Sequence, residues 1–295
     1  MLAFFGVLAA VLASSPPAGS GPLIYLSDPA DGNLNAYSQR EPSDMVLQIQ
    51  HLATPGPLWV DSRKQVFVAQ EDGWIFGYRP GATQFFTRFE EAWYAQFDPV
   101  TPVGLCGDRA GSVYYAEQAF SNSAAFLALY HIGNPNYLSY VEFDTNGQEN
   151  ILGCAVDAAG DVIASIPAPP SGSYVEEFFY PPFSGGYAIL PVPVGTLLID
   201  RSNNLVDASY CGSSPCITVY APPYTGSPLL TITSIPVSGP IALDATGKHL
   251  WTVTTSNGSS QLLEFGYPSG KAEYASPSLP FSPGGLALSP PVSPQ

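Results

Sequence analysis

The chain has 295 residues, 45% of them hydrophobic, and it carries 24 acidic against 9 basic side chains, a formal net charge of −15 at pH 7. This balance argues against nucleic acid and anionic membrane surfaces as partners, because both would repel the protein. The 28 glycines and 31 prolines supply many turns, and no stretch shows a long apolar repeat of 3.6 residues. The composition therefore favours a single all-β domain with little helix.

The first residues resemble an export signal. Met1 to Ala13 form an apolar run followed by small residues and two prolines, without a preceding Lys or Arg. The run is shorter than the roughly 20 residues that a membrane-spanning helix needs. We assign 1–20 to a signal-like leader and linker, 21–290 to one domain and 291–295 to a tail, and we expect an extracytoplasmic protein with no membrane span once the leader is removed.

The first two units of the domain supply the predicted strands. Three strands open the domain: Leu23 to Ser27, Asn33 to Tyr37 and Met45 to Gln50. Four short strands, named a to d, make up the next unit: Leu58 to Asp61, Gln65 to Gln70, Trp74 to Tyr78 and Gln84 to Phe89. A short helix could follow at Phe89 to Phe97.

This four-strand unit returns along the chain, each time with an Asp at the end of strand a. The marker residues are spaced by 43 to 49 residues: Asp61, Asp108, Asp157, Asp200 and Asp244, with Ser289 in a sixth position. Such a period is typical of the blades of a β-propeller. Because Asp accepts hydrogen bonds from backbone N–H groups two residues on, we interpret these carboxylates as turn-stabilising and not as a ligand ring.

The two ends of the chain decide the blade count. The first unit has no strand a, whereas Gly285 to Ser289 has the strand-a pattern with no further strand behind it. Pairing these ends would close the ring and remove its exposed sheet edges. The predicted fold is a six-bladed β-propeller with four antiparallel strands per blade, the first blade being closed by the C-terminal strand.

Four cysteines fit an exported chain. Cys211 and Cys216 flank a b–c turn, which predicts a disulfide between them. Cys106 and Cys154 lie in strands a of adjacent units, where they could form a disulfide across the blade interface or stay as two buried thiols. The cysteine spacing fits no tetrahedral zinc site. The chain's histidines are scattered: His51, His131 and His249.

Charge is divided between the two poles of the predicted ring. In an antiparallel meander the a–b and c–d turns share one pole, here called the basic pole, and the b–c and d–a loops share the acidic pole. The basic pole takes eight of the nine basic residues: Arg40, Arg63, Lys64, Arg79, Arg109, Arg201, Lys248 and Lys271. The acidic pole collects uncompensated carboxylates: Asp28, Asp31, Glu71, Asp72, Asp98, Glu117, Asp144, Glu149 and Asp207.

This division predicts a negative potential at one mouth of the central channel. The candidate residues for binding a cation or cationic ligand come from the b–c loops of three consecutive blades: Asp31, Glu71, Asp72 and Glu117. Their hard carboxylate oxygens favour Ca²⁺ or another divalent cation as the cofactor. The alternative is a solvated acidic surface that keeps an exported protein soluble.

Two pairs of segments resemble bacterial NHL-repeat and gluconolactonase-like propellers: Gly56 to Asp61 with Val66 to Ala69, and Gly239 to Gly247 with Leu250 to Val253. Enzymes of the gluconolactonase group hold one divalent metal at the channel mouth, using a Glu before Gly-Pro-x-Trp and an Asp before Gly-Ile-Ala. The corresponding residues here are Pro55 and Ser238. The resemblance therefore implies the fold without the two carboxylates that support the metal chemistry.

Three functions are compatible with these patterns. The preferred one is an exported, monomeric, non-catalytic propeller that binds a protein or small-molecule ligand through its acidic pole. The second is a metal-dependent lactonase or hydrolase with a metal shell rebuilt from the same acids. The third is a purely structural ring at the cell surface. The patterns assign no catalytic residue and no metal ligand.

Overall fold

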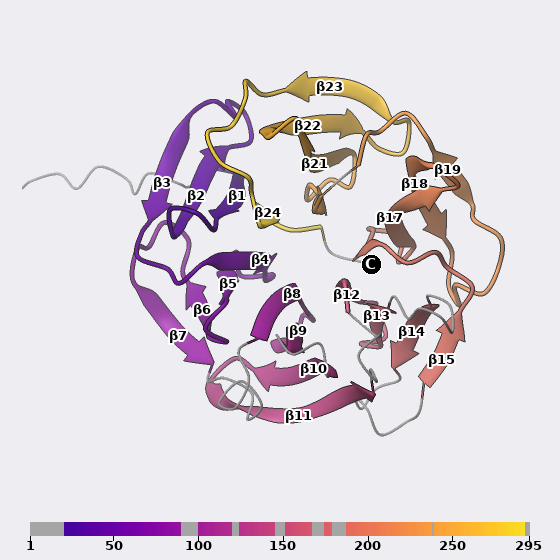
Figure 1. Cartoon of the computed structure of the whole chain (residues 1–295), viewed down its shortest axis with the longest axis horizontal. Coiled ribbons are helices and arrows are strands. Elements are labelled where there is room, and N and C mark those ends of the chain that lie inside the picture. Colours follow the sequence, from indigo (N-terminus) through magenta and orange to yellow (C-terminus); the bar gives the residue numbers. More distant parts are fainter. Residues whose placement is uncertain are drawn as a thin grey trace, which may run out of the picture.

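The computed structural model describes residues 21–89, 100–119, 124–144, 151–166, 174–178, 187–237 and 239–292. Its strands form six antiparallel four-stranded sheets arranged around a central axis, the arrangement of a β-propeller (Figure 1). These ranges contain no helix, and so none that could cross a membrane. Of the helix expected at Phe89 to Phe97, Phe89 instead ends a strand, and 90–97 lie outside the described residues.

The first half of the chain forms three sheets, numbered in chain order. Sheet 1 contains β24 (Gly285–Ser289), β1 (Leu23–Asp28), β2 (Asn33–Ser38) and β3 (Met45–Ile49). Sheet 2 contains β4 (Pro55–Val60), β5 (Val66–Gln70), β6 (Ile75–Tyr78) and β7 (Phe85–Phe89). Sheet 3 contains β8 (Val100–Gly107), β9 (Ser112–Ala119), β10 (Ala124–His131) and β11 (Asn134–Asp144).

The second half forms the other three. Sheet 4 contains β12 (Gly153–Val156), β13 (Val162–Ile166), β14 (Tyr174–Phe178) and β15 (Tyr187–Leu190). Sheet 5 contains β16 (Thr196–Ile199), β17 (Leu205–Cys211), β18 (Ser214–Tyr220) and β19 (Leu230–Ile232). Sheet 6 contains β20 (Ile241–Leu243), β21 (His249–Ser256), β22 (Ser259–Gly266) and β23 (Lys271–Ala275).

Both ends of the chain build sheet 1, as the sequence predicts. Strand β1 pairs with β24 in antiparallel register, from Leu23 opposite Ser289 to Ser27 opposite Gly285. Its other edge pairs with β2. Figure 1 shows the late segment β24 inserted beside the early segment β1, at the inner end of the sheet. A strand-a pattern without following strands thus finds its partners at the start of the domain.

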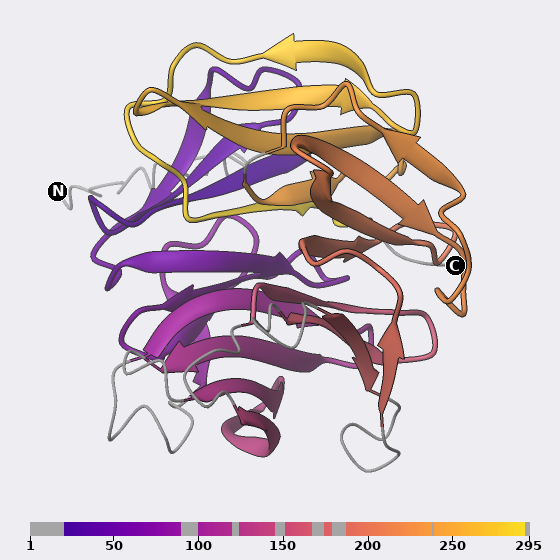
Figure 2. The ribbon, with the colours of Figure 1, turned by 45° about the vertical axis from the view of Figure 1, so that its right-hand side comes forward.

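The hydrophobic core lies between neighbouring sheets. One cluster packs Ile24 and Leu26 of sheet 1 against Trp251 and Leu262 of sheet 6. The second strands of sheets 1 and 2, β1 and β5, are buried at every position, and each begins with four apolar residues in a row. The outer strand β23 is mostly exposed. The sheets therefore pack face to face around the axis, as the oblique view in Figure 2 shows.

Two disulfides join the four cysteines. Cys211 and Cys216 close the β17–β18 hairpin, with their Cα atoms 5.7 Å apart. Cys106 of β8 and Cys154 of β12 are bonded across sheets 3 and 4, with a Cα separation of 5.8 Å. The structure thus selects the disulfide from the two alternatives for the second pair, because the two innermost strands bring these side chains face to face.

Candidate functional site

The central channel is an apolar space. The innermost strands of the six sheets enclose a cavity of about 190 Å³, whose described lining includes Leu58, Trp59, Leu105, Leu197 and Leu286. The Cys106–Cys154 disulfide also lies on its wall. No described residue of this lining carries an ionisable side chain. The described residues of this part of the channel therefore offer neither a general acid or base nor a carboxylate to hold a metal ion. The adjoining space of about 500 Å³ at its basic-pole end is lined in part by Asp108, Arg109 and Asp157.

The mouth at the acidic pole is equally poor in charge. Its described lining consists of glycine, proline, threonine, cysteine and apolar residues, among them Pro57, Gly153, Thr196 and Gly285. Pro55, the position of the gluconolactonase-group glutamate, begins β4 and offers no ligand atom. Ser238, the second family position, lies outside the described residues. The described residues at this mouth do not fit the metal that the resemblance implies.

None of the four candidate acids is among the described residues that line that mouth. Asp31 is exposed in the β1–β2 turn, and the β5–β6 turn carries half-buried Glu71 beside exposed Asp72. Glu117 is fully buried (0% exposed) within β9, opposite Phe126 of β10. We expected Glu117 in a b–c loop, but β9 extends to Ala119 and includes it. In the described part of the chain, no group close enough to hold one metal ion contains any of these four acids.

The other acids of this pole differ in burial. Asp28 is buried, and its Oδ1 accepts a hydrogen bond from the backbone N–H of Asp31 at 3.2 Å. Asp144 ends β11. Asp98 and Glu149 lie outside the described residues.

The ninth basic residue, Arg88, lies on the acidic side of the ring. Arg88 of β7 stacks its guanidinium over the ring of Trp74, 4.7 Å from the ring centroid. Trp74 follows the β5–β6 turn, so one cation does stand on this side of the ring. Eight of the nine basic residues remain on the other side.

The marker aspartates are turn residues, as the sequence predicts. In each of the five turns, one carboxylate oxygen accepts the backbone N–H four residues on, at 2.7 to 2.9 Å: Asp61 from Gln65, Asp108 from Ser112, Asp157 from Asp161, Asp200 from Asn204 and Asp244 from Lys248. Three of the same oxygens also accept the N–H two residues on, at 2.8 to 2.9 Å: those of Asp61, Asp157 and Asp200. Local backbone donors thus occupy these carboxylates.

Two of these turns are also held by the next sheet. The hydroxyl of Tyr224 donates to Asp157 Oδ2 at 3.4 Å, and that of Tyr267 donates to Asp200 Oδ2 at 3.1 Å. Both pairs are separated by 67 residues, so each tyrosine reaches back from its own sheet to the turn of the preceding one. Burial and the negative charge of Asp200 raise the pKa of Tyr267, which keeps its hydroxyl a donor.

Asp207 is a buried carboxylate in the middle of a sheet. It is 0% exposed in β17, and its Oδ2 accepts hydrogen bonds from Ser209 (2.6 Å) and Thr218 (3.1 Å). Its Oδ1 has no hydrogen-bond partner and faces Gly195, whose missing Cβ would lie only 2.5 Å away. Burial raises the pKa of Asp207 to about 6, against the lowering effect of the two hydroxyl donors.

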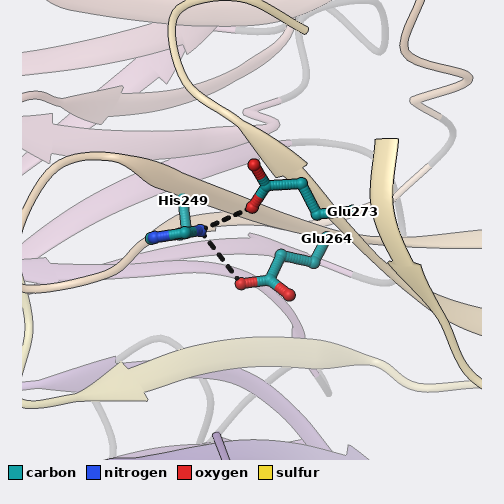
Figure 3. Close-up of side chains that lie close together, drawn as sticks. All are labelled: His249, Glu264 and Glu273. Atoms are coloured by element: carbon teal, nitrogen blue, oxygen red, sulfur yellow. Dashed lines mark hydrogen bonds and ion pairs between the residues drawn. The ribbon is translucent and has the colours of Figure 1, made fainter. Parts of the chain in front are cut away.

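A three-residue cluster on sheet 6 has the geometry of a ligand site (Figure 3). His249 Nδ1 lies 2.8 Å from Glu273 Oε2 and 3.1 Å from Glu264 Oε1. The residues come from β21, β22 and β23, and their donor atoms all lie within 4.8 Å of one another. Their side chains are 38%, 20% and 37% exposed for His249, Glu264 and Glu273, so the cluster is open to solvent.

The charges within this cluster are not balanced. Burial is the main effect that raises the pKa of Glu264; the imidazole of His249 lowers it, while the charges of Glu273 and Asp244 raise it further. Among the described residues, His249 is the one basic side chain within ion-pair distance of either glutamate. Two carboxylates therefore share a single imidazole.

One signal in the sequence could have located part of this cluster. Asn257 and Gly258 both have positive φ, 52° and 76°, and form the two-residue turn between β21 and β22. An Asn-Gly pair between apolar strands is a strong hairpin signal, and it fixes the register. Counting back from this turn places Trp251 opposite Glu264, two pairs from His249 opposite Gly266.

Comparison with known proteins shows the fold alone. No protein-family model and no curated protein sequence matches the chain. Among solved structures, TolB from Acinetobacter baumannii aligns with a TM-score of 0.64 and 12% identity, over 94% of this chain and 68% of TolB. Hydrazine synthase from Kuenenia stuttgartiensis aligns with a TM-score of 0.60 and 10% identity, over 96% and 93% of the respective chains.

A third structure, a functionally unknown protein from Desulfotomaculum acetoxidans, aligns with a TM-score of 0.55 and 11% identity, over 85% of this chain and 78% of that one. TolB and hydrazine synthase are β-propeller proteins. The comparisons thus agree with the arrangement of the sheets, and identities of this size carry no information on activity.

Proposed function

We propose that this chain is an exported, non-catalytic six-bladed β-propeller, each sheet being one blade, that binds a cationic ligand or partner through its acidic pole. At the level of sequence pattern it resembles NHL-repeat and gluconolactonase-like propellers. The gluconolactonase-like reaction is set aside, because the described residues of the channel and its acidic-pole mouth supply no carboxylate.

The observation that carries this proposal is the placement of the basic side chains by the fold. Eight of the nine basic residues belong to the turns of one pole, while Asp31, Glu71 and Asp72 occupy turns at the other pole, on the adjacent sheets 1 and 2. Exposed carboxylates on neighbouring turns create a negative surface that attracts cationic groups over about one Debye length, roughly 8 Å at physiological salt. This favours recognition by charge.

Export is supported by the cysteines. Both disulfides are formed, and no cysteine is free. Disulfides persist in oxidising compartments and are rare in the cytosol. A TolB-like propeller is consistent with the same location.

The test compares two charge-matched double variants. Asp31→Asn with Asp72→Asn removes two carboxylates from the acidic pole, and Glu41→Gln with Asp44→Asn removes two exposed ones from the β2–β3 turn at the basic pole. Binding of a fluorescent lysine-rich decapeptide is followed by anisotropy at low and high salt. We expect at least a tenfold loss of affinity in the first variant and little change in the second. An equal effect of both variants, or no binding to the unmodified protein, would overturn the proposal.

A further inference from the structure

We propose that His249, Glu264 and Glu273 form a binding site for a divalent transition-metal ion, with Zn²⁺ as the best match. The site lies on sheet 6, near the basic pole, and is distinct from the acidic-pole surface of the proposed function. It stands on the geometry of three side chains from three adjacent strands.

The distances between the donor atoms suit one shared ion. Zn²⁺ binds imidazole nitrogen and carboxylate oxygen at about 2.0–2.2 Å, so two ligand atoms of one ion lie roughly 3 to 3.5 Å apart. Glu264 Oε1 is 3.1 Å and Glu273 Oε2 is 2.8 Å from His249 Nδ1. The donor atoms of all three side chains lie within 4.8 Å of one another, so small side-chain rotations would place them around a single ion.

The cluster keeps a net negative charge in either protonation state of His249, and a bound cation would balance it. Both glutamates approach the same nitrogen, Nδ1, and that nitrogen carries at most one hydrogen. With His249 neutral the cluster has a charge of −2, and with His249 protonated it still has −1. A divalent ion would replace the single shared proton and compensate both carboxylates.

The type of donor selects the ion. An imidazole nitrogen with two carboxylate oxygens suits Zn²⁺ and its neighbours among the transition metals, whereas Ca²⁺ and Mg²⁺ prefer shells made entirely of oxygen. Three protein ligands leave at least one position for water, and the exposure of His249 and Glu273 gives solvent access to it. This differs from the Ca²⁺ that the acidic pole led us to expect.

The backbone around the cluster directs Glu273 toward His249. A register irregularity between β22 and β23 falls at Glu273, since Glu264 pairs with Tyr274 and Phe265 with Ala272. Such a bulge re-aims a side chain. Opposite His249, Gly266 leaves room for the glutamate, because a Cβ there would lie 2.9 Å from Glu273 Oε1.

The neighbouring turn holds the histidine strand in place. The backbone N–H of His249 donates to Asp244 Oδ1 at 3.0 Å, so a marker aspartate fixes the start of β21. A bound ion would join β21, β22 and β23. Because the unfolded chain does not preserve this arrangement, binding would stabilise the folded state.

The experiment is a calorimetric titration of the full chain with ZnCl₂ after removal of metal by EDTA and dialysis, together with thermal melts. The test variants are His249→Ala and Glu273→Gln, the latter altering a partly exposed side chain that the fold tolerates. His131→Ala is the matched control, because His131 is an exposed histidine whose Nδ1 lies 2.9 Å from the carbonyl of Ile132.

We expect one equivalent of Zn²⁺, a melting temperature that rises with Zn²⁺, and at least a tenfold loss of affinity in both test variants. The His131→Ala variant should bind as the unmodified protein does, and a large excess of Ca²⁺ should not displace Zn²⁺. Stoichiometric binding that survives in both test variants would overturn the proposal. So would the absence of Zn²⁺ binding in the unmodified chain.

Discussion

Carboxylates near the basic pole fall into two kinds. The five marker aspartates accept backbone N–H groups from their own turns, as Asp200 does from Ser202 and Asn204. Glu264 and Glu273, in the neighbouring region of sheet 6, share a single imidazole nitrogen. The marker aspartates and the two glutamates carry the same charge and lie on the same side of the ring. What distinguishes a structural carboxylate from a ligand carboxylate here is therefore the number of hydrogen-bond donors around it.

Removing a fully occupied turn carboxylate should have the largest effect. In Asp200→Ala, two backbone N–H groups, the Asn204 amide and the Tyr267 hydroxyl lose their acceptor. At about 1 kcal/mol each, the free energy of unfolding should fall by about 4 kcal/mol. Urea denaturation measures this, with Asp200→Asn as a milder control that retains one oxygen. A loss below about 1 kcal/mol in Asp200→Ala would contradict the turn role.

Removing the buried carboxylate of Asp207 should stabilise the folded protein, whereas removing that of Asp200 should destabilise it. The pKa of Asp207 in the folded protein, about 6, lies above the ordinary 3.8, so the folded protein retains a proton that the unfolded chain loses. Stability therefore falls as pH rises from about 4 to 6, by at most about 3 kcal/mol. Asp207→Asn should be more stable than the unmodified chain by about 2 kcal/mol at pH 8, with the gain absent at pH 4. A gain independent of pH would show that this titration is not the cause.

A smaller effect is expected when a single hydrogen bond between sheets 5 and 6 is removed from a marker aspartate. Tyr267→Phe removes one hydroxyl donor from Asp200 Oδ2 while its backbone donors stay in place. The free energy of unfolding should fall by about 1 kcal/mol. Urea denaturation of this variant together with Asp200→Ala and the double variant completes a cycle. Full additivity of the two changes would show that the tyrosine and the aspartate do not interact.

The smallest effect is expected for the metal cluster without metal. His249 and Glu273 are partly exposed, and exposed ion pairs contribute little. Without Zn²⁺, His249→Ala should change the free energy of unfolding by less than about 1 kcal/mol. A much larger loss in metal-free buffer would assign His249 a structural role like that of the marker aspartates.

The sequence was sufficient for the features that repeat. The Asp that ends strand a, the turn behind it and the pairing of Gly285 to Ser289 with the first strand all follow local rules of turns and strand patterns. The sequence was insufficient where the position of a side chain depends on the exact length of a strand or on a diagonal contact between strands. Glu117 belongs to a strand and not to a loop because β9 is longer than its pattern indicates, and no local pattern indicates that Arg88 stacks on Trp74.

The cluster on sheet 6 was missed for a related reason. Asn257 and Gly258 fix the β21–β22 register, but Glu273 reaches His249 through an irregularity between β22 and β23. Regular pairing rules do not place a residue at a bulge. At the acidic pole, the sequence places Asp31, Glu71 and Asp72 in turns, whereas their absence from the described lining of the channel mouth needed the positions of the strands.

The most direct measurement is anomalous diffraction at the zinc absorption edge from crystals of the full chain soaked in Zn²⁺. Our account predicts a peak about 2.1 Å from His249 Nδ1 and from one oxygen of each of Glu264 and Glu273, with no peak at the marker aspartates. A peak at Asp61, Asp108, Asp157, Asp200 or Asp244, with none at the cluster, would contradict the division of these carboxylates into structural and ligand-binding groups.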